Sequence, residues 1–191
     1  MLIVKATSTD TVSAGLVART GADSGARAGG VFHVQCFDKD GNLKWETSEH
    51  NLVVNQGLQD MNTQYFKGST YSAAFYLGLV TGPGSGTTFA AADTLASKAW
   101  TEFTNYSGSR KAVTFGTATT ADPSVITNSA SPSSFTISGA GGTVAGAFLC
   151  TVASGTSGVL FSESDFQSPG DRVVISGDTL NVTYTFSLDA A

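Results

Sequence analysis

The sequence predicts a mainly β protein: an antiparallel β-sandwich or jelly-roll-like domain with one principal short helix and an extended N-terminal arm. Three observations predict this class. From residue 111 onward, short apolar runs are separated by Gly, Pro, Ser and Asp, a spacing typical of sandwiches. Helical periodicity is confined to a segment near residues 56–66. The first 29 residues are polar and rich in small side chains, as in extended segments.

Size and charge limit the organisation and the partners. The 191 residues are enough for one domain with a hydrophobic core, so we predict an arm over residues 1–29 and a single sandwich over 30–191. Charged residues make up 13%, about half the usual share of roughly 25%, which favours extensive contact with partners. The net charge is −5 and the cations are scattered, so neither nucleic acid nor an anionic membrane is an expected partner.

The N-terminal arm carries two short apolar patches, Leu2–Val4 and Leu16–Val17, in a slightly basic segment. These patches are suited to dock on a partner, while a frayed terminus is an equally good interpretation. The first apolar run is too short for a signal peptide, and no stretch has the length of a membrane span. We therefore expect a protein made in the cytoplasm.

The sandwich domain opens with "VFHVQCFDKDGNLKWETS", in which two alternating runs flank an Asp-Gly turn. This pattern predicts a β-hairpin. The same stretch places Asp38, Asp40, Asn42 and Glu49 at ligand positions of a calcium loop, but the position that requires Gly holds Leu43. We therefore predict a turn and no bound metal.

The next segment, "NLVVNQGLQDMNTQYF", predicts the helix. Asn55 is suited to the N-cap, and Leu58, Met61 and Tyr65 fall on one face at spacings of three and four. "AAFYLGLV" then predicts a buried strand, and "TGPGSGTTFAAA" a glycine-rich loop.

The C-terminal region predicts strands alone, from "KAVTFGTAT" to "TLNVTYTFSLD". The last run places alternate apolar side chains from Leu180 to Leu188 on one face, as in a half-buried antiparallel strand. Gly177-Asp178 before it is expected to form a two-residue hairpin turn that closes the sheet.

Cysteines and histidines give no sign of a cofactor. Cys36 and Cys150 each lie in an apolar run, which favours buried free thiols over the alternative of a disulfide. His33 and His50 lack the close spacing of metal ligands. We predict no metal and no cofactor.

The densest chemistry lies in "DTLASKAWTEFTNYSGSR", residues 93–110. Asp93 is predicted to cap a helix of about two turns. Trp100, Phe103 and Tyr106 would seat this turn on the sheet, and Glu102 would pair with Arg110. The alternative is a glycosidase site in which Asp93 and Glu102 are the carboxylates and Trp100 stacks on sugar. Because no other catalytic motif is present, we favour a structural clasp and expect no enzyme.

The order "FDKDGNLKWE", "NLVVNQGL", "FYLGLV" and "DTLASKAWTEFTNYSGSR" resembles a family of small virion proteins of tailed bacteriophages. The likeness covers residues 30–110 well and the C-terminal region in character. In the last block the family pattern has Asp-Thr, a small-residue turn, Trp-x-Glu, and Tyr-Ser with an Arg. This chain departs at Lys98-Ala99, where the family has a His and a slightly longer turn. The resemblance implies a β-sandwich or jelly-roll similar to capsid cement or decoration proteins.

We therefore expect a cement protein that binds the outside of the assembled phage head and bridges capsid subunits. Its expected partners are the major capsid protein and further copies of itself, as a dimer or trimer. An acidic body suits the outer surface better than the DNA-filled lumen. The alternative is a tail or fibre-associated protein that binds a host-surface glycan, for which Tyr71, Trp100 and Tyr106 are candidate exposed aromatics.

Overall fold

The computed structural model describes residues 25–67, 74–82, 89–167 and 170–190. Most of the predicted arm lies outside these residues. The last part of the predicted arm is described: Ala26–Gly29 belongs to the first strand and pairs with the last strand of the chain. The sandwich therefore begins about four residues before the predicted boundary.

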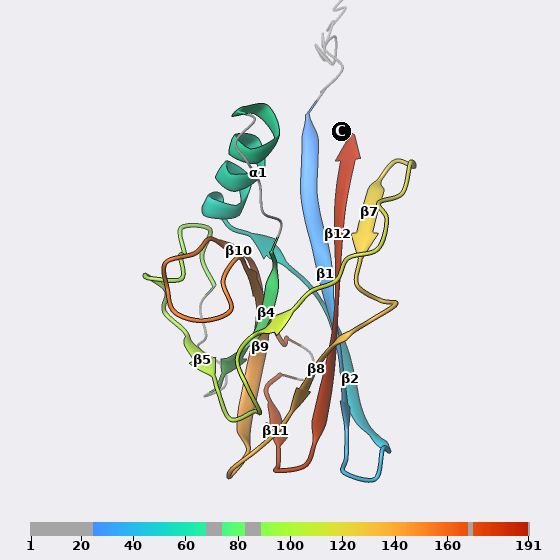
Figure 1. Ribbon diagram of the computed structural model, residues 1–191, viewed down its shortest axis with the longest axis vertical. Helices are drawn as coiled ribbons and strands as arrows, with labels where there is room; N and C mark the ends of the chain where they lie inside the picture. The colour runs from blue at the N-terminus through green and yellow to red at the C-terminus, as the bar shows by residue number, and fades with distance from the viewer. Residues whose placement is uncertain (1–24, 68–73, 83–88, 168–169, 191) are drawn as a thin grey trace, which may run out of the picture.

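The protein is mainly β and consists of two sheets, in which every pairing is antiparallel, and one helix (Figure 1). This confirms the predicted fold class. The first sheet has the order β2-β1-β12-β7, with β8 also on β12. Its strands are β1 (Ala26–Phe37), β2 (Leu43–His50), β7 (Ser124–Thr127), β8 (Ser133–Thr136) and β12 (Thr179–Ala190).

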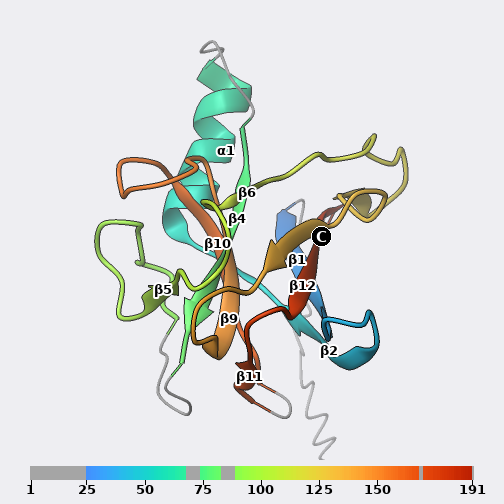
Figure 2. The same ribbon diagram turned by 60° about the horizontal axis from the view of Figure 1, so that its bottom comes forward.

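The second sheet has the order β3-β10-β9-β4-β5, with β11 also on β9 and β6 on β4. Its strands are β3 (Leu52–Val53), β4 (Tyr76–Thr81), β5 (Thr101–Phe103), β6 (Lys111–Ala112), β9 (Gly142–Cys150), β10 (Leu160–Asp165) and β11 (Arg172–Val174). The segment between β6 and β7 passes from one sheet to the other (Figure 2). The predicted strand "KAVTFGTAT" is thus reduced to two paired residues.

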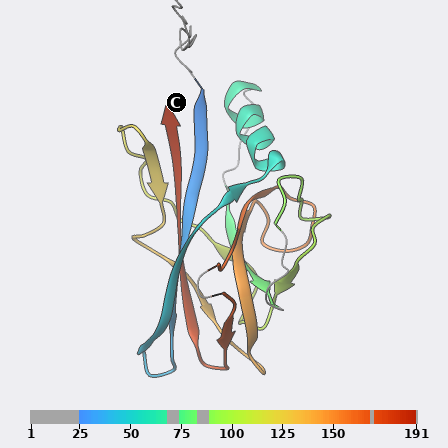
Figure 3. The ribbon, with the colours of Figure 1, turned by 180° about the vertical axis from the view of Figure 1, so that it is seen from behind.

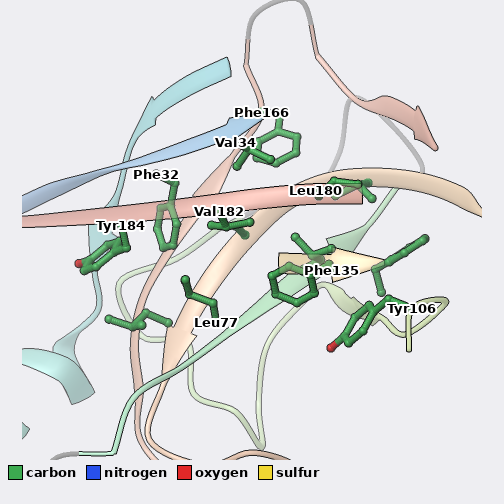
Figure 4. Close-up of a cluster of buried hydrophobic side chains, with 14 of the residues drawn as sticks. Phe32, Val34, Leu77, Tyr106, Phe135, Phe166, Leu180, Val182 and Tyr184 are labelled. Carbon is green, nitrogen blue, oxygen red and sulfur yellow. The ribbon is translucent and has the colours of Figure 1, made fainter. Parts of the chain in front are cut away.

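The core lies between the two sheets, as the alternation along β1 and β12 predicts. Phe32 on β1 packs against Tyr184 on β12, with ring centroids 4.7 Å apart, and Leu77 on β4 belongs to the same cluster (Figure 4). Leu180 and Val182 are fully buried, whereas Leu188, near the end of β12, is partly exposed. Burial of the alternating side chains holds β12 in register against β1.

The predicted β1–β2 hairpin is present. In its turn, Asp38 Oδ1 accepts hydrogen bonds of 2.9 Å from the backbone N–H groups of Asp40 and Asn42. Asp40 instead pairs with Lys39. These bonds lower the pKa of Asp38, the Asn42 side-chain bond being the largest cause. The carboxylates that resemble calcium ligands are therefore engaged by the turn itself.

We expect thermal melts with and without millimolar calcium to overlay, because the Asp38 carboxylate already has its partners. A ligand that binds the native state raises the melting temperature by mass action. Differential scanning calorimetry measures this directly, and a shift of several degrees on adding calcium would contradict the prediction.

The helix α1 (Asn55–Lys67) lies where the periodicity predicts, but it packs differently. Its first intrahelical bond runs from the Leu58 N–H to the Val54 carbonyl, so Val54 rather than Asn55 is the N-cap. Gly57 is buried against β10, where a Cβ would collide with the Phe161 carbonyl oxygen. Of the three residues predicted on one face, Met61 contacts the core, whereas Leu58 and Tyr65 are exposed. The close approach at Gly57 decides the docking of the helix.

The predicted hairpin at Gly177-Asp178 is wrong. β11 pairs with β9 in the second sheet, and β12 pairs with β1 in the first, so the turn carries the chain between sheets. Asp178 Oδ2 accepts a hydrogen bond from the Ile175 N–H, and Gly177 has a positive φ of 92°. Gly177-Asp178 correctly predicted a tight turn. The same residues suit a hairpin turn and a turn that connects two sheets, so they could not distinguish the two.

Candidate functional site

The stretch from Asp93 to Trp100 is a turn and not the predicted helix. The Thr94 N–H donates to the Ser97 carbonyl, and the Ser97 N–H donates to both the carbonyl and the hydroxyl of Thr94. Asp93 Oδ2 accepts a bond from the Ala90 N–H, which precedes it in the chain. Such local side-chain bonds compete with a helix, and this explains why no helix forms.

Trp100 lies beneath this turn and is 5% exposed. Its ring packs against Phe148 on β9 and Phe89, with centroids 4.8 and 6.1 Å away. Its indole Nε1 donates a 2.8 Å hydrogen bond to Glu163 Oε2 on β10. Since the ring is enclosed by the second sheet and the turn, it offers no open face to a sugar.

Glu163, which the sequence analysis missed, is the centre of this arrangement. It is fully buried, and its Oε1 has no hydrogen-bond partner among the described residues. Burial raises its pKa to about 8, and the neighbouring Asp93 carboxylate raises it further, against the opposing effect of the Trp100 bond. The raised pKa favours the protonated carboxyl, which can donate its proton to the neighbouring Asp93 carboxylate. The available signal was the indole N–H of a buried Trp100, which needs an acceptor.

The predicted pair of Glu102 and Arg110 is present as a two-point ion pair. Arg110 Nε lies 2.8 Å from Glu102 Oε1, and Nη2 lies 2.7 Å from Oε2. Arg110 is 6% exposed and its guanidinium lies over the Phe148 ring. Its Nη1 donates to the Val152 carbonyl at 3.2 Å. Arg110 thus joins Glu102 on β5 to the segment that follows β9.

Tyr106 is buried on the other side of the same sheet. Its ring meets Phe135 edge-on at 4.9 Å, and its backbone forms a bridge with Ile137 (Figure 4). The five residues predicted as a clasp are Asp93, Trp100, Glu102, Tyr106 and Arg110. Trp100, Tyr106 and Arg110 are buried in the body of the sandwich; Glu102 binds Arg110, Asp93 accepts a backbone N–H, and Trp100 donates to Glu163.

The glycosidase alternative finds no support in this region. A glycosidase needs two carboxyl groups facing a shared sugar site, whereas Glu102 is bound to Arg110 and Asp93 faces Glu163. Within the described residues, no group of three or more His, Cys, Asp or Glu side chains is placed to hold a metal ion. Both cysteines are free and buried, as predicted, and burial raises the pKa of Cys36 to about 11.

Three of the exposed hydrophobic side chains, Tyr65, Phe66 and Leu188, line a second feature, which we call the α1 groove. It encloses about 570 Å³ between α1 and the ends of β1 and β12. Figures 1 and 3 show these elements side by side from opposite directions. Its apolar lining comprises Met61, Tyr65, Phe66, Phe75, Phe161 and Leu188.

Two aromatic side chains on the last turns of α1 dominate the groove. Tyr65 is 84% exposed and Phe66 78% exposed, with ring centroids 5.0 Å apart. Aromatic side chains are enriched at protein interfaces. The periodicity placed Tyr65 on one helix face with Leu58 and Met61 and did not single out Phe66, because periodicity does not show which face meets the sheet.

Comparison with protein-family models, with curated proteins and with solved structures finds no match to this chain. The helix α1 is too short and too polar to cross a membrane, and no other described helix exists to do so.

Proposed function

We propose that the protein is a structural component of a bacteriophage virion, a cement or decoration protein on the outer surface of the head. The observation that carries this proposal is the α1 groove, a strongly apolar and exposed surface at the end of the sandwich where the N-terminal arm begins. Its partners are the major capsid protein and neighbouring copies of itself. The resemblance of residues 30–110 to small virion proteins provides the biological context.

The distribution of polar groups supports binding over catalysis. Glu163 accepts the bond that fastens Trp100 to the second sheet, and Glu102 and Arg110 are engaged with each other. Tyr184 accepts a bond from Asn51 and contacts the Ser162 hydroxyl within the core. The described surface exposes the apolar side chains of the α1 groove, and burial of such a surface drives association.

Low charge and the arm fit a protein with several contacts. Only 13% of the residues are charged, and interfaces tolerate low charge better than free surface does. An arm that reaches a neighbouring subunit adds a second binding point, which increases avidity without another folded domain. The proposed contact end is therefore the α1 groove together with residues 1–24.

The proposal predicts that particles lacking the protein assemble but burst at lower temperature or milder osmotic shock, because a ligand of the assembled lattice stabilises it at every site. Purified protein should bind these particles and restore their stability. Light scattering during a thermal ramp, with and without added protein, measures the effect.

A surface variant sharpens this test. Tyr65→Ser with Phe66→Ser should weaken rebinding by at least about 30-fold, as expected for interface aromatics, and should leave folding intact because both side chains are exposed. Leu58→Ser on the same helix, where Leu58 is 41% exposed and outside the groove, is the matched control.

Stable heads in phage that fail to adsorb to cells would favour the tail or fibre alternative. That alternative loses two candidate aromatics, since Trp100 and Tyr106 are buried, and Tyr71 lies outside the described residues.

A further inference from the structure

We infer that the α1 groove is the docking site of the chain's own Leu16–Val17, which anchors the N-terminal arm beside α1. This inference rests on the proposed function and deepens it: Leu16–Val17 docks against the wall formed by Met61, Phe75 and Leu188, and the exposed rings of Tyr65 and Phe66 stay available to the capsid protein. It is tested on the free protein, so its failure is separable from failure of the capsid proposal.

The groove requires an apolar occupant. Tyr65 and Phe66 are almost fully exposed, and Met61, Phe75 and Leu188 continue the apolar wall beneath them. Contiguous exposed apolar surface of this kind marks an interaction site in a soluble protein. A volume of about 570 Å³ accommodates several aliphatic side chains but not a folded domain.

The arm begins at this groove. Ala26, the first residue of β1, lines the groove and pairs with Ala190 at the end of β12. The nearest preceding pair of large aliphatic side chains is Leu16–Val17, nine residues before Ala26. Nine residues span at most about 30 Å, and Gly21 and Gly25 permit the chain to reverse direction.

Tether length favours Leu16–Val17 over the other apolar patch, Leu2–Val4. The effective concentration of a tethered group falls roughly as the −3/2 power of linker length. Leu2–Val4 is separated from Ala26 by 22 residues, so its effective concentration at the groove is lower by about fourfold. The short tether also favours docking within one chain over docking between copies.

The charges around Leu16–Val17 also favour this pair as the occupant of the α1 groove. Residues 11–18, "TVSAGLVA", carry no charge, and Arg19 follows directly. Asp60 is the one charged residue among the described lining of the groove, and its Oδ1 accepts a bond from Gln64 at 3.3 Å. An aliphatic pair followed by a cation thus matches an apolar groove with one carboxylate at its rim.

Disulfide trapping in the full-length chain tests the inference. Leu16→Cys with Met61→Cys should form a crosslink within one chain under mild oxidation. Native Cys36 and Cys150 are buried, so they do not compete. In Leu16→Cys with Leu58→Cys, the second cysteine lies on the same helix but outside the groove, and we expect crosslinking at least about tenfold slower.

The second control is Leu2→Cys with Met61→Cys. Tether length alone would make the Leu2 pair crosslink about fourfold more slowly than the Leu16 pair. If Leu16–Val17 docks in the groove, the difference in crosslinking rate should be larger than this. Equal rates for the Met61 and Leu58 pairs would overturn the inference. Disulfide-linked dimers would assign the groove to a second copy, and a faster Leu2 pair would assign it to Leu2–Val4; either result also overturns the inference.

A dye-binding measurement covers the case in which a cysteine variant fails to fold. Leu16→Ser with Val17→Ser should open the groove and increase ANS fluorescence several-fold, while Leu2→Ser with Ile3→Ser should not. Adding Phe66→Ser to the first variant should remove the increase. Unchanged fluorescence in the Leu16 and Val17 variant would contradict docking.

Discussion

Replacing Trp100 with alanine is expected to lower the free energy of unfolding by about 3 to 5 kcal/mol. The ring is 5% exposed and packs against Phe148 and Phe89, so its removal leaves a cavity between the turn and the second sheet. The variant also removes the donor to Glu163. Urea denaturation followed by circular dichroism measures the loss.

Trp100→Phe separates the two contributions. Phenylalanine retains most of the packing but lacks the indole N–H, so the expected loss is about 1 to 3 kcal/mol, the cost of an unsatisfied buried polar group. A sugar-binding role makes the opposite prediction: Trp100→Ala would keep its stability and lose glycan binding. The ordering of wild type, phenylalanine and alanine variants therefore distinguishes a structural residue from a ligand platform.

Much of the fold could be predicted because its strands have local signals. Alternation from Leu180 to Tyr184 marks β12, and the Asp-Gly turn marks the β1–β2 hairpin. Turn residues alone cannot say whether the next strand joins the same sheet. Gly177 therefore marked a real turn, but its role as a corner depends on β11 pairing with β9, which is a long-range contact.

In the candidate site, too, a contact between residues close in sequence was predicted, whereas a contact between distant residues was missed. Glu102 and Arg110 are eight residues apart in sequence, and their pairing was predicted correctly. Glu163 lies 63 residues from Trp100, on a strand in which it is as deeply buried as its apolar neighbours, so no local pattern connects the two. The exposure of Tyr65 was missed because it depends on the close approach of Gly57 to β10.

The stability of the protein is expected to fall as the pH rises from about 4.5 to about 8, because of Glu163. Burial and then Asp93 raise the pKa of Glu163 from its ordinary 4.5 to about 8 in the folded protein. Between these values the folded state binds more protons than the unfolded state. Linkage then requires the free energy of unfolding to decrease with rising pH, and to level off above the folded pKa. The expected loss is a few kcal/mol, since each pH unit contributes about 1.4 kcal/mol.

Glu163→Gln isolates this contribution. The amide can accept the Trp100 bond and donate toward Asp93 without a charge, so the variant should lack this pH dependence and should be more stable than wild type at pH 8. Asp93→Asn should shift the fall in stability to lower pH, because it removes the neighbouring charge that raises the pKa of Glu163. Asp165, whose pKa is also raised by burial, then by Asp171 and Glu49, contributes in the same direction and is unchanged in both variants. Urea midpoints measured from pH 4.5 to 9 give the three profiles, and parallel curves for wild type and Glu163→Gln would show that Glu163 is ionised throughout the range.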